Sequence, residues 1–238
     1  MSKPLLLLVD DAPDLGTVVT ALGRLCGCAV DCRPDAAAAR EYLQSARPDL
    51  VLLDVGLPGE SGVVLCRQLR ATPALADLRV ALFSHWGLPA DVAAGLDAGA
   101  DFLFSKDLVC QPDEWRRRLS EALAWRRGRR AASSARPTPD WVARTNQALA
   151  HPSLRRAGPE VVRVLLRRAL REAFPPDVGG DAWLAPGGAA LDASRVPPLP
   201  AEAVRALVDA LADLAWRLLG ADDSSAFRGA LAAAVTAG

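Results

Sequence analysis

Acidic side chains follow two apolar runs in the first quarter of the chain. The run from Leu5 to Val9 ends in Asp10 and Asp11, and the run from Leu50 to Leu53 ends in Asp54. Continuous apolar runs of this length are typical of strands buried on both faces of a parallel sheet. The carboxyl ends of neighbouring parallel strands meet at one edge, where open α/β sheets bind their ligands. We therefore expect three carboxylates to converge there.

Three carboxylates in one crevice repel one another unless a cation neutralises them. Oxygen ligands suit a hard ion such as Mg²⁺. Two later apolar runs end in Ser84 and near Lys106, which adds a hydroxyl and an ammonium group to the same edge. A cation, an ammonium and a hydroxyl together can hold a phosphoryl group on Asp54.

The order and spacing of these residues resemble the receiver domain of two-component response regulators. The resemblance rests on the acid pair, Ser84, the D-x-x-L-P-x-x-x-G run from Asp54 to Gly62, and Lys106 after the phrase at 98–101. It covers about the first half of the chain, and the combination is specific although each piece alone is weak. The alternative is a receiver that has kept its fold and lost its chemistry. The presence of every expected phospho-site residue argues against that alternative.

The resemblance implies roles for these residues and a partner. Asp54 would accept a phosphoryl group from a sensor histidine kinase. Ser84 and Lys106 would contact that group. The Mg²⁺ ligands would be Asp10, Asp11, Asp54 and the backbone carbonyl of Gly56.

Four positions depart from the commoner receiver pattern. Asp107 replaces the proline that follows the lysine in many receivers, and Leu103 stands where many have a switching aromatic residue. His85 and Trp86 follow the hydroxyl residue. These changes are compatible with phosphorylation, but they put the usual aromatic movement in doubt.

Alternating strand and helix patterns predict the architecture. Residues 1–126 are expected to form an α/β receiver domain, a doubly wound, flavodoxin-like sheet of five parallel strands. The small, proline-punctuated residues 127–139 are expected to be a linker. Residues 140–238 are expected to form a second, all-α output domain, with 175–200 as a long loop or a small hairpin.

A heptad-like seam in residues 201–219 suggests an oligomer. Its members are spaced 3-4-3-4: Val204, Leu207, Leu211, Leu214 and Leu218. Because a small helical domain covers only part of such a surface, we expect a homodimer through residues 140–238. The alternative is that 160–174 and 226–237 cover the seam within one chain.

Composition narrows the functions of the output domain. With 51% hydrophobic and 24% charged residues, the chain is expected to fold around a packed core. Residues 115–136 hold 8 Arg and one Glu, whereas 137–238 hold 11 residues of each sign. A DNA-binding domain needs a basic face on a folded helix, whereas residues 137–238 have no net charge. DNA binding is therefore possible but not favoured. We interpret the basic stretch Arg116–Arg130 as a solvated helix face that runs into the linker.

The number of cysteines and the length of the first apolar run indicate the cellular compartment of the protein. The five cysteines are odd in number, and the run from Leu5 to Val9 is too short for a signal peptide or a membrane span. We expect a cytoplasmic protein. Cys26, Cys28 and Cys32 fit no zinc spacing that we recognise, so we interpret them as small buried thiols.

Together these observations predict a phosphorylation-controlled response regulator. Its helical output domain is expected to act through protein contact or dimerisation, on a downstream partner that the sequence does not name. The alternative is a transcription regulator with an unfamiliar helical DNA-binding domain. A separate enzymatic activity is not expected, because residues 140–238 show no catalytic group or nucleotide loop.

Overall fold

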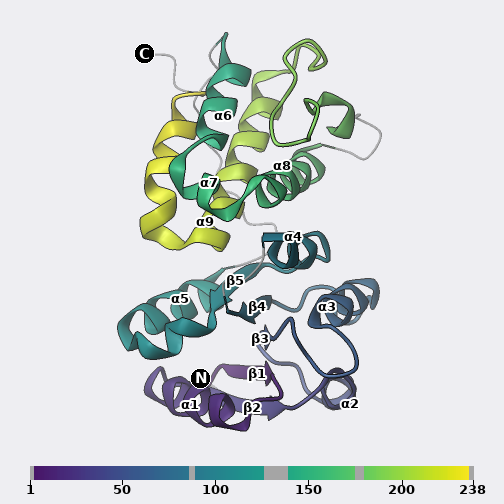
Figure 1. Cartoon of the computed structure of the whole chain (residues 1–238), viewed down its shortest axis with the longest axis vertical. Helices are drawn as coiled ribbons and strands as arrows, with labels where there is room; N and C mark the ends of the chain where they lie inside the picture. The colour runs from purple at the N-terminus through teal and green to yellow at the C-terminus, as the bar shows by residue number, and fades with distance from the viewer. Residues whose placement is uncertain (1–2, 86–88, 126–138, 175–179, 236–238) are drawn as a thin grey trace. The chain divides into compact units, whose positions relative to one another are not determined.

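A computed structural model describes residues 3–85, 89–125, 139–174 and 180–235. The chain divides into two compact units, Met1–Arg127 and Gly128–Gly238 (Figure 1). Trp86 and, apart from Pro139, the expected linker lie outside the described residues. None of the described helices is both long enough and apolar enough to cross a membrane.

The first unit is a five-stranded parallel sheet in the order β2-β1-β3-β4-β5. The strands are β1 (Leu5–Val9), β2 (Ala29–Arg33), β3 (Leu50–Leu53), β4 (Val80–Ser84) and β5 (Phe102–Ser105). The helices are α1 (Pro13–Leu25), α2 (Ala36–Ser45), α3 (Gly62–Ala71), α4 (Pro89–Asp97) and α5 (Pro112–Ala124), with a short 3-10 helix, η1 (Lys106–Cys110). Figure 1 shows α1 and α5 on one side of the sheet and α2, α3 and α4 on the other. The predicted doubly wound α/β fold is confirmed.

The buried strands account for this architecture. Leu6–Val9 and Leu50–Leu53 are at most 1% exposed, because helices cover both faces of β1 and β3. Local signals set the helix ends. Asp35 caps α2 by accepting a hydrogen bond from the Ala38 N–H, and Ser61 caps α3 by accepting one from the Val63 N–H.

A buried ion pair ties α3 to β5. The Arg70 guanidinium lies 2.7 Å from the Asp101 carboxylate, whose side chain is fully buried. The guanidinium also donates to the carbonyls of Gly99, Ala76 and Leu78, and the same Asp101 oxygen accepts the Val80 N–H. One arginine therefore satisfies several loop carbonyls at the amino-terminal edge of β4 and β5.

The second unit is helical, as predicted. Its elements are α6 (Trp141–Leu149), α7 (Pro152–Ala157), α8 (Pro159–Ala173), η2 (Gly180–Trp183) and α9 (Ala201–Ala232). An antiparallel bridge joins Leu184 and Leu191. The Asn146 amide on α6 donates to the Leu191 carbonyl and accepts the Leu191 N–H, both at 2.8 Å. Neither of the two interpretations of residues 175–200 is matched in full: the described residues 180–200 combine η2 with irregular chain and this single bridge, and no strand is formed in them.

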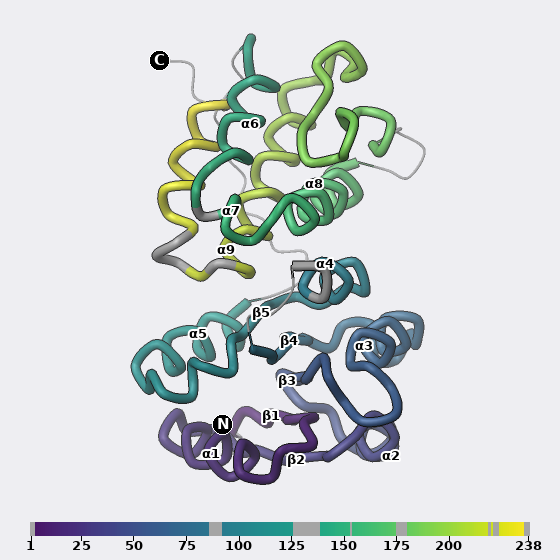
Figure 2. Tube along the Cα trace, in the orientation of Figure 1, coloured from purple at the N-terminus to yellow at the C-terminus, as the bar shows by residue number. Residues whose placement is uncertain are grey.

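Three local features shape the helices of this unit. Pro152 begins a further short helix, α7, because proline is tolerated at a first helical position. Asp140 does not cap α6 with its side chain, which accepts from the Arg144 guanidinium instead. Gly220, with φ 82° and ψ 177°, interrupts α9, which otherwise runs to Ala232. Figure 2 traces α9 beside α6 and α8, against which it packs.

The seam on α9 is buried within the chain. Its five members are at most 3% exposed, and α6 and α8 pack against α9. The premise of the expected homodimer was an uncovered seam, and that premise is wrong. Among the described residues, the exposed large apolar side chains are Val18, Leu25 and Val64, all of which lie in the first unit.

Replacing Arg70 should destabilise the first unit strongly. Arg70→Met leaves a buried carboxylate without its guanidinium, which costs about 3 kcal/mol in the free energy of unfolding. Urea unfolding of the full chain, followed by tryptophan fluorescence, measures the change. Arg67→Met, on the exposed face of the same helix, is the control and should shift the midpoint little. Equal midpoints for the two variants would contradict a structural role for the pair.

Candidate active site

Strand register brings the distant acids together. Val9 on β1 is paired with Leu53 on β3, so Asp10 and Asp54 follow paired residues at the same sheet edge. The Asp54 N–H donates to the Val9 carbonyl at 2.9 Å, which extends the ladder by one residue. The backbone therefore places the two carboxylates side by side.

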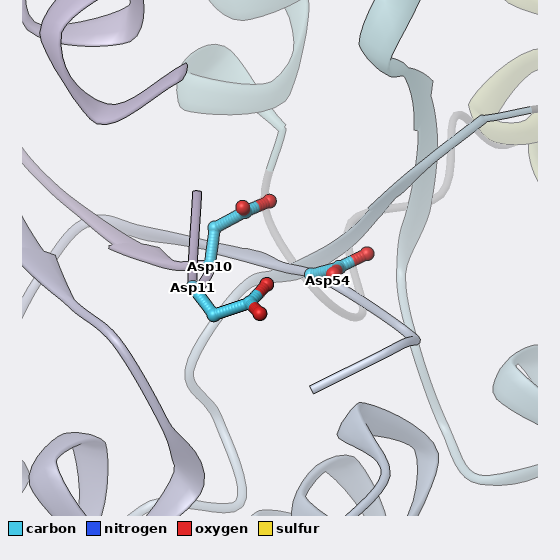
Figure 3. Close-up of side chains that lie close together, drawn as sticks. All are labelled: Asp10, Asp11 and Asp54. Carbon is cyan, nitrogen blue, oxygen red and sulfur yellow. The ribbon is translucent and has the colours of Figure 1, made fainter. Parts of the chain in front are cut away.

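The predicted acid cluster is present. Ligand oxygens of Asp10, Asp11 and Asp54 all lie within 4.8 Å of one another. Figure 3 shows the three carboxylates gathered at the ends of β1 and β3. The Asp10 and Asp54 side chains are buried, whereas Asp11 is exposed. Two acids of the cluster are therefore buried, and the third is exposed to solvent.

Lys106 joins this cluster, as the sequence predicted. Its Nζ lies 2.7 Å from Asp10 Oδ2 and 3.1 Å from Asp54 Oδ1. Burial by itself would lower the pKa of Lys106, but the Asp10 and Asp54 carboxylates outweigh burial and raise that pKa above its ordinary value. The lysine is therefore an ammonium ion at neutral pH and offsets part of the acidic charge.

The hydroxyl of Ser84 takes a different partner. Ser84 ends β4, but its Oγ donates to the carbonyl of His85 at 2.9 Å. The His85 imidazole in turn lies 3.5 Å from the Asp107 carboxylate, and both side chains are largely exposed. The β4–β5 register explains this contact, since Ser84 is paired with Ser105 and the following residues are neighbours.

Gly56 lies next to the phosphoacceptor candidate. A Cβ built on Gly56 would stand 3.7 Å from Asp54 Oδ2, so the loop after β3 folds closely around this carboxylate. Gly62 is under a harder constraint, because a Cβ there would come within 1.9 Å of the Asp54 carbonyl. Only glycine lets the start of α3 pack onto the Asp54 peptide.

The donor set fits a hard divalent cation. One Asp10 oxygen accepts the Ala12 N–H, and the other lies 2.7 Å from the Lys106 Nζ. Acceptor capacity therefore remains at the centre of the cluster. All the candidate ligands are oxygens, which is the preference of Mg²⁺ rather than of softer metals.

The other sequence candidates lie outside this cluster. Arg117 pairs with Glu114 and Glu121 on its own helix, and Arg118 is buried and donates to the Leu103 carbonyl. The interpretation of this stretch as a solvated face is therefore wrong for Arg118, and Arg126–Arg130 lie outside the described residues.

The cysteines form no disulfide and differ in burial. All five thiols are free. Cys28 and Cys66 are buried, Cys26 is half-buried, and Cys32 and Cys110 are exposed. The interpretation as buried thiols is thus correct for Cys28 and wrong for Cys32.

Comparison with known proteins identifies the family that most of the first unit matches. The family model described as "Response regulator receiver domain" matches residues 6–119. A gliding motility regulatory protein of Myxococcus xanthus is 40% identical over 95 residues, which are 40% of this chain and 12% of that protein. The DNA-binding response regulator MtrA of Mycolicibacterium smegmatis is 36% identical over 107 residues, which are 45% of this chain and 43% of that protein. The chain thus spans less than half the length of these curated relatives.

A solved structure is also similar to about half of this chain. The receiver domain of the sensor histidine kinase PA1611 from Pseudomonas aeruginosa, with a magnesium ion coordinated in its active site cleft, is 26% identical. The match covers 52% of this chain and 100% of that one, with a TM-score of 0.48. Residues 6–119 of this chain are a receiver domain of two-component response regulators.

Proposed function

We propose that this chain is a response regulator controlled by phosphorylation of Asp54. A sensor histidine kinase would be the donor, and the donor set for Mg²⁺ would be Asp10, Asp11, Asp54 and the Gly56 carbonyl. The observation that carries this proposal is the convergence of three carboxylates, two of them in contact with the Lys106 ammonium.

The chemistry follows from charge. A carboxylate oxygen of Asp54 would attack the phosphorus of a phosphohistidine, so that an O–P bond forms and the N–P bond to the imidazole breaks. The attack brings negative charge toward an acidic site. When bound, a divalent cation supplies positive charge for the phosphoryl oxygens. Lys106 would supply the second positive charge, and its contact with Asp54 supports this role.

Ser84 would complete the phosphorylated state. Its Oγ donates to the His85 carbonyl in this structure, so holding a phosphoryl oxygen would require the hydroxyl to change partner. That exchange would couple the chemistry on Asp54 to the segment after β4. Such a coupling does not need an aromatic side chain at Leu103.

For the output, we favour protein contact over DNA binding. Several relatives, MtrA among them, are DNA-binding regulators, but the family match ends at residue 119. Residues 137–238 hold acidic and basic residues in equal number, and the basic side chains on α8 are engaged locally. Arg163 pairs with Glu160, and Arg167 lies 3.5 Å from Asp181. A neutral, internally paired surface is a poor match for a phosphate backbone.

Asp54→Asn should abolish phosphorylation. The amide is a poor nucleophile, so incubation with acetyl phosphate and Mg²⁺ should add no phosphoryl group to the variant. Mass spectrometry of the intact protein measures the addition. Asp113→Asn, a fully exposed acid on α5, is the control and should be labelled like the parent. Undiminished labelling of Asp54→Asn would refute the assignment.

Asp11→Asn should weaken Mg²⁺ binding while leaving the fold intact. Asp11 is the exposed member of the cluster, so its loss removes an anionic ligand without uncovering a buried partner. We expect the dissociation constant for Mg²⁺, measured by calorimetry, to rise about tenfold or more. Asp14→Asn makes the same charge change one turn along and should have a much smaller effect. The prediction fails if both variants bind Mg²⁺ equally well.

A further inference from the structure

The loop between β3 and α3 carries part of the candidate cation site. It begins at Asp54, includes the Gly56 carbonyl and ends at Ser61, the cap of α3. Its own hydrogen bonds close its base: the Ser61 hydroxyl and the Gly62 N–H both donate to the Val55 carbonyl, at 3.2 and 3.1 Å. These bonds join the loop to itself and to the first residue of α3.

Three side chains connect this loop to two helices. Arg40 of α2 donates to Glu60 Oε2 at 2.6 Å and to Gln68 Oε1 at 2.9 Å. Gln68 of α3 donates to the other Glu60 oxygen, Oε1, at 2.7 Å. Each member of this Arg40–Glu60–Gln68 ring therefore bonds to both of the others.

The ring restrains the position of the Glu60 side chain more than it stabilises the protein electrostatically. The Arg40 and Glu60 side chains are 42% and 26% exposed, so solvent screens their attraction. The two Glu60 oxygens, however, face donors on different helices. Any displacement of Glu60 lengthens at least one of these bonds, and a loop that is held before binding needs less ordering when a ligand arrives.

We propose that Arg40 and Gln68 are positioning residues for the divalent cation, acting through Glu60 on the loop that carries the Gly56 carbonyl. This inference rests on the proposed function, since it presupposes a cation held by Asp10, Asp11 and Asp54. Glu60 itself is not a ligand in this scheme. Its role is to hold the loop against α2 and α3.

Gln68→Met provides the decisive test. The substitution keeps the length of the side chain and the net charge but removes both hydrogen bonds of the glutamine. Calorimetric titration of the full chain with MgCl₂ should show a dissociation constant about threefold to tenfold higher than that of the parent. The unfolding temperature without Mg²⁺ should stay close to that of the parent, because Gln68 is exposed. Gln44→Met, at an exposed position on α2, is the matched control and should bind Mg²⁺ normally.

A second variant distinguishes positioning of the loop from the electrostatic effect of the Arg40 charge on cation binding. Arg40→Met removes a positive charge, which by field alone would strengthen cation binding. Positioning predicts weaker binding instead, and predicts that the Arg40→Met/Gln68→Met double variant loses less than the product of the two single losses. Parent-like Mg²⁺ affinity in Gln68→Met, or tighter binding in Arg40→Met, overturns the proposal.

The outcomes also distinguish this inference from the proposed function. If the parent binds Mg²⁺ and Asp11→Asn weakens it, while Gln68→Met has no effect, only the positioning role is wrong. If Asp11→Asn binds Mg²⁺ as tightly as the parent does, the proposed cation site is wrong and the positioning role falls with it.

Discussion

The ammonium group of Lys106 is the interaction on which the charged edge of the sheet depends. It lies between Asp10 and Asp54, whose side chains are almost completely buried and would otherwise repel each other. Repulsion between buried carboxylates is relieved either by protonation or by a counter-charge. Here the counter-charge comes from the chain itself, and the two carboxylates raise the pKa of Lys106, which favours its charged form. The ammonium group thus offsets the repulsion between the two carboxylates in a buried part of the sheet edge.

Backbone geometry places these charges before any side chain contributes. Parallel pairing of β1 with β3 and of β4 with β5 brings residues that are far apart in the chain to one edge. Gly62 then permits α3 to begin directly on the Asp54 peptide, where a Cβ would collide with the carbonyl. At the opposite edge, the Arg70–Asp101 pair satisfies loop carbonyls. The two charged clusters thus lie at opposite edges of one sheet, one after β1 and β3 and the other before β4 and β5.

The helical unit shows a different use of charge. Arg217 on α9 is 1% exposed and lies near Asp213 of its own helix and Glu172 of α8. The helix thus buries a charged residue together with its leucine seam, and ion pairing makes this burial possible. The other helices of the second unit, α6, α7 and α8, all pack against α9. The surfaces left for a partner are polar, since the large exposed apolar side chains among the described residues lie in the first unit.

The sequence by itself determined the sheet of the first unit and the residues that gather at its acidic edge. Continuous apolar runs followed by acids permit few arrangements, because buried strands must pair and their carboxyl ends must meet. Tertiary structure alone decided which surfaces were covered. The pattern of Val204 to Leu218 is the same whether its partner is another chain or α8, since periodicity records that a face is buried and not what buries it. Tertiary structure alone also decided the contacts of the Arg40–Glu60–Gln68 ring and of Arg118. Polar residues at surface-like positions carry no periodic signal, and their partners become neighbours only when separate helices and loops pack together.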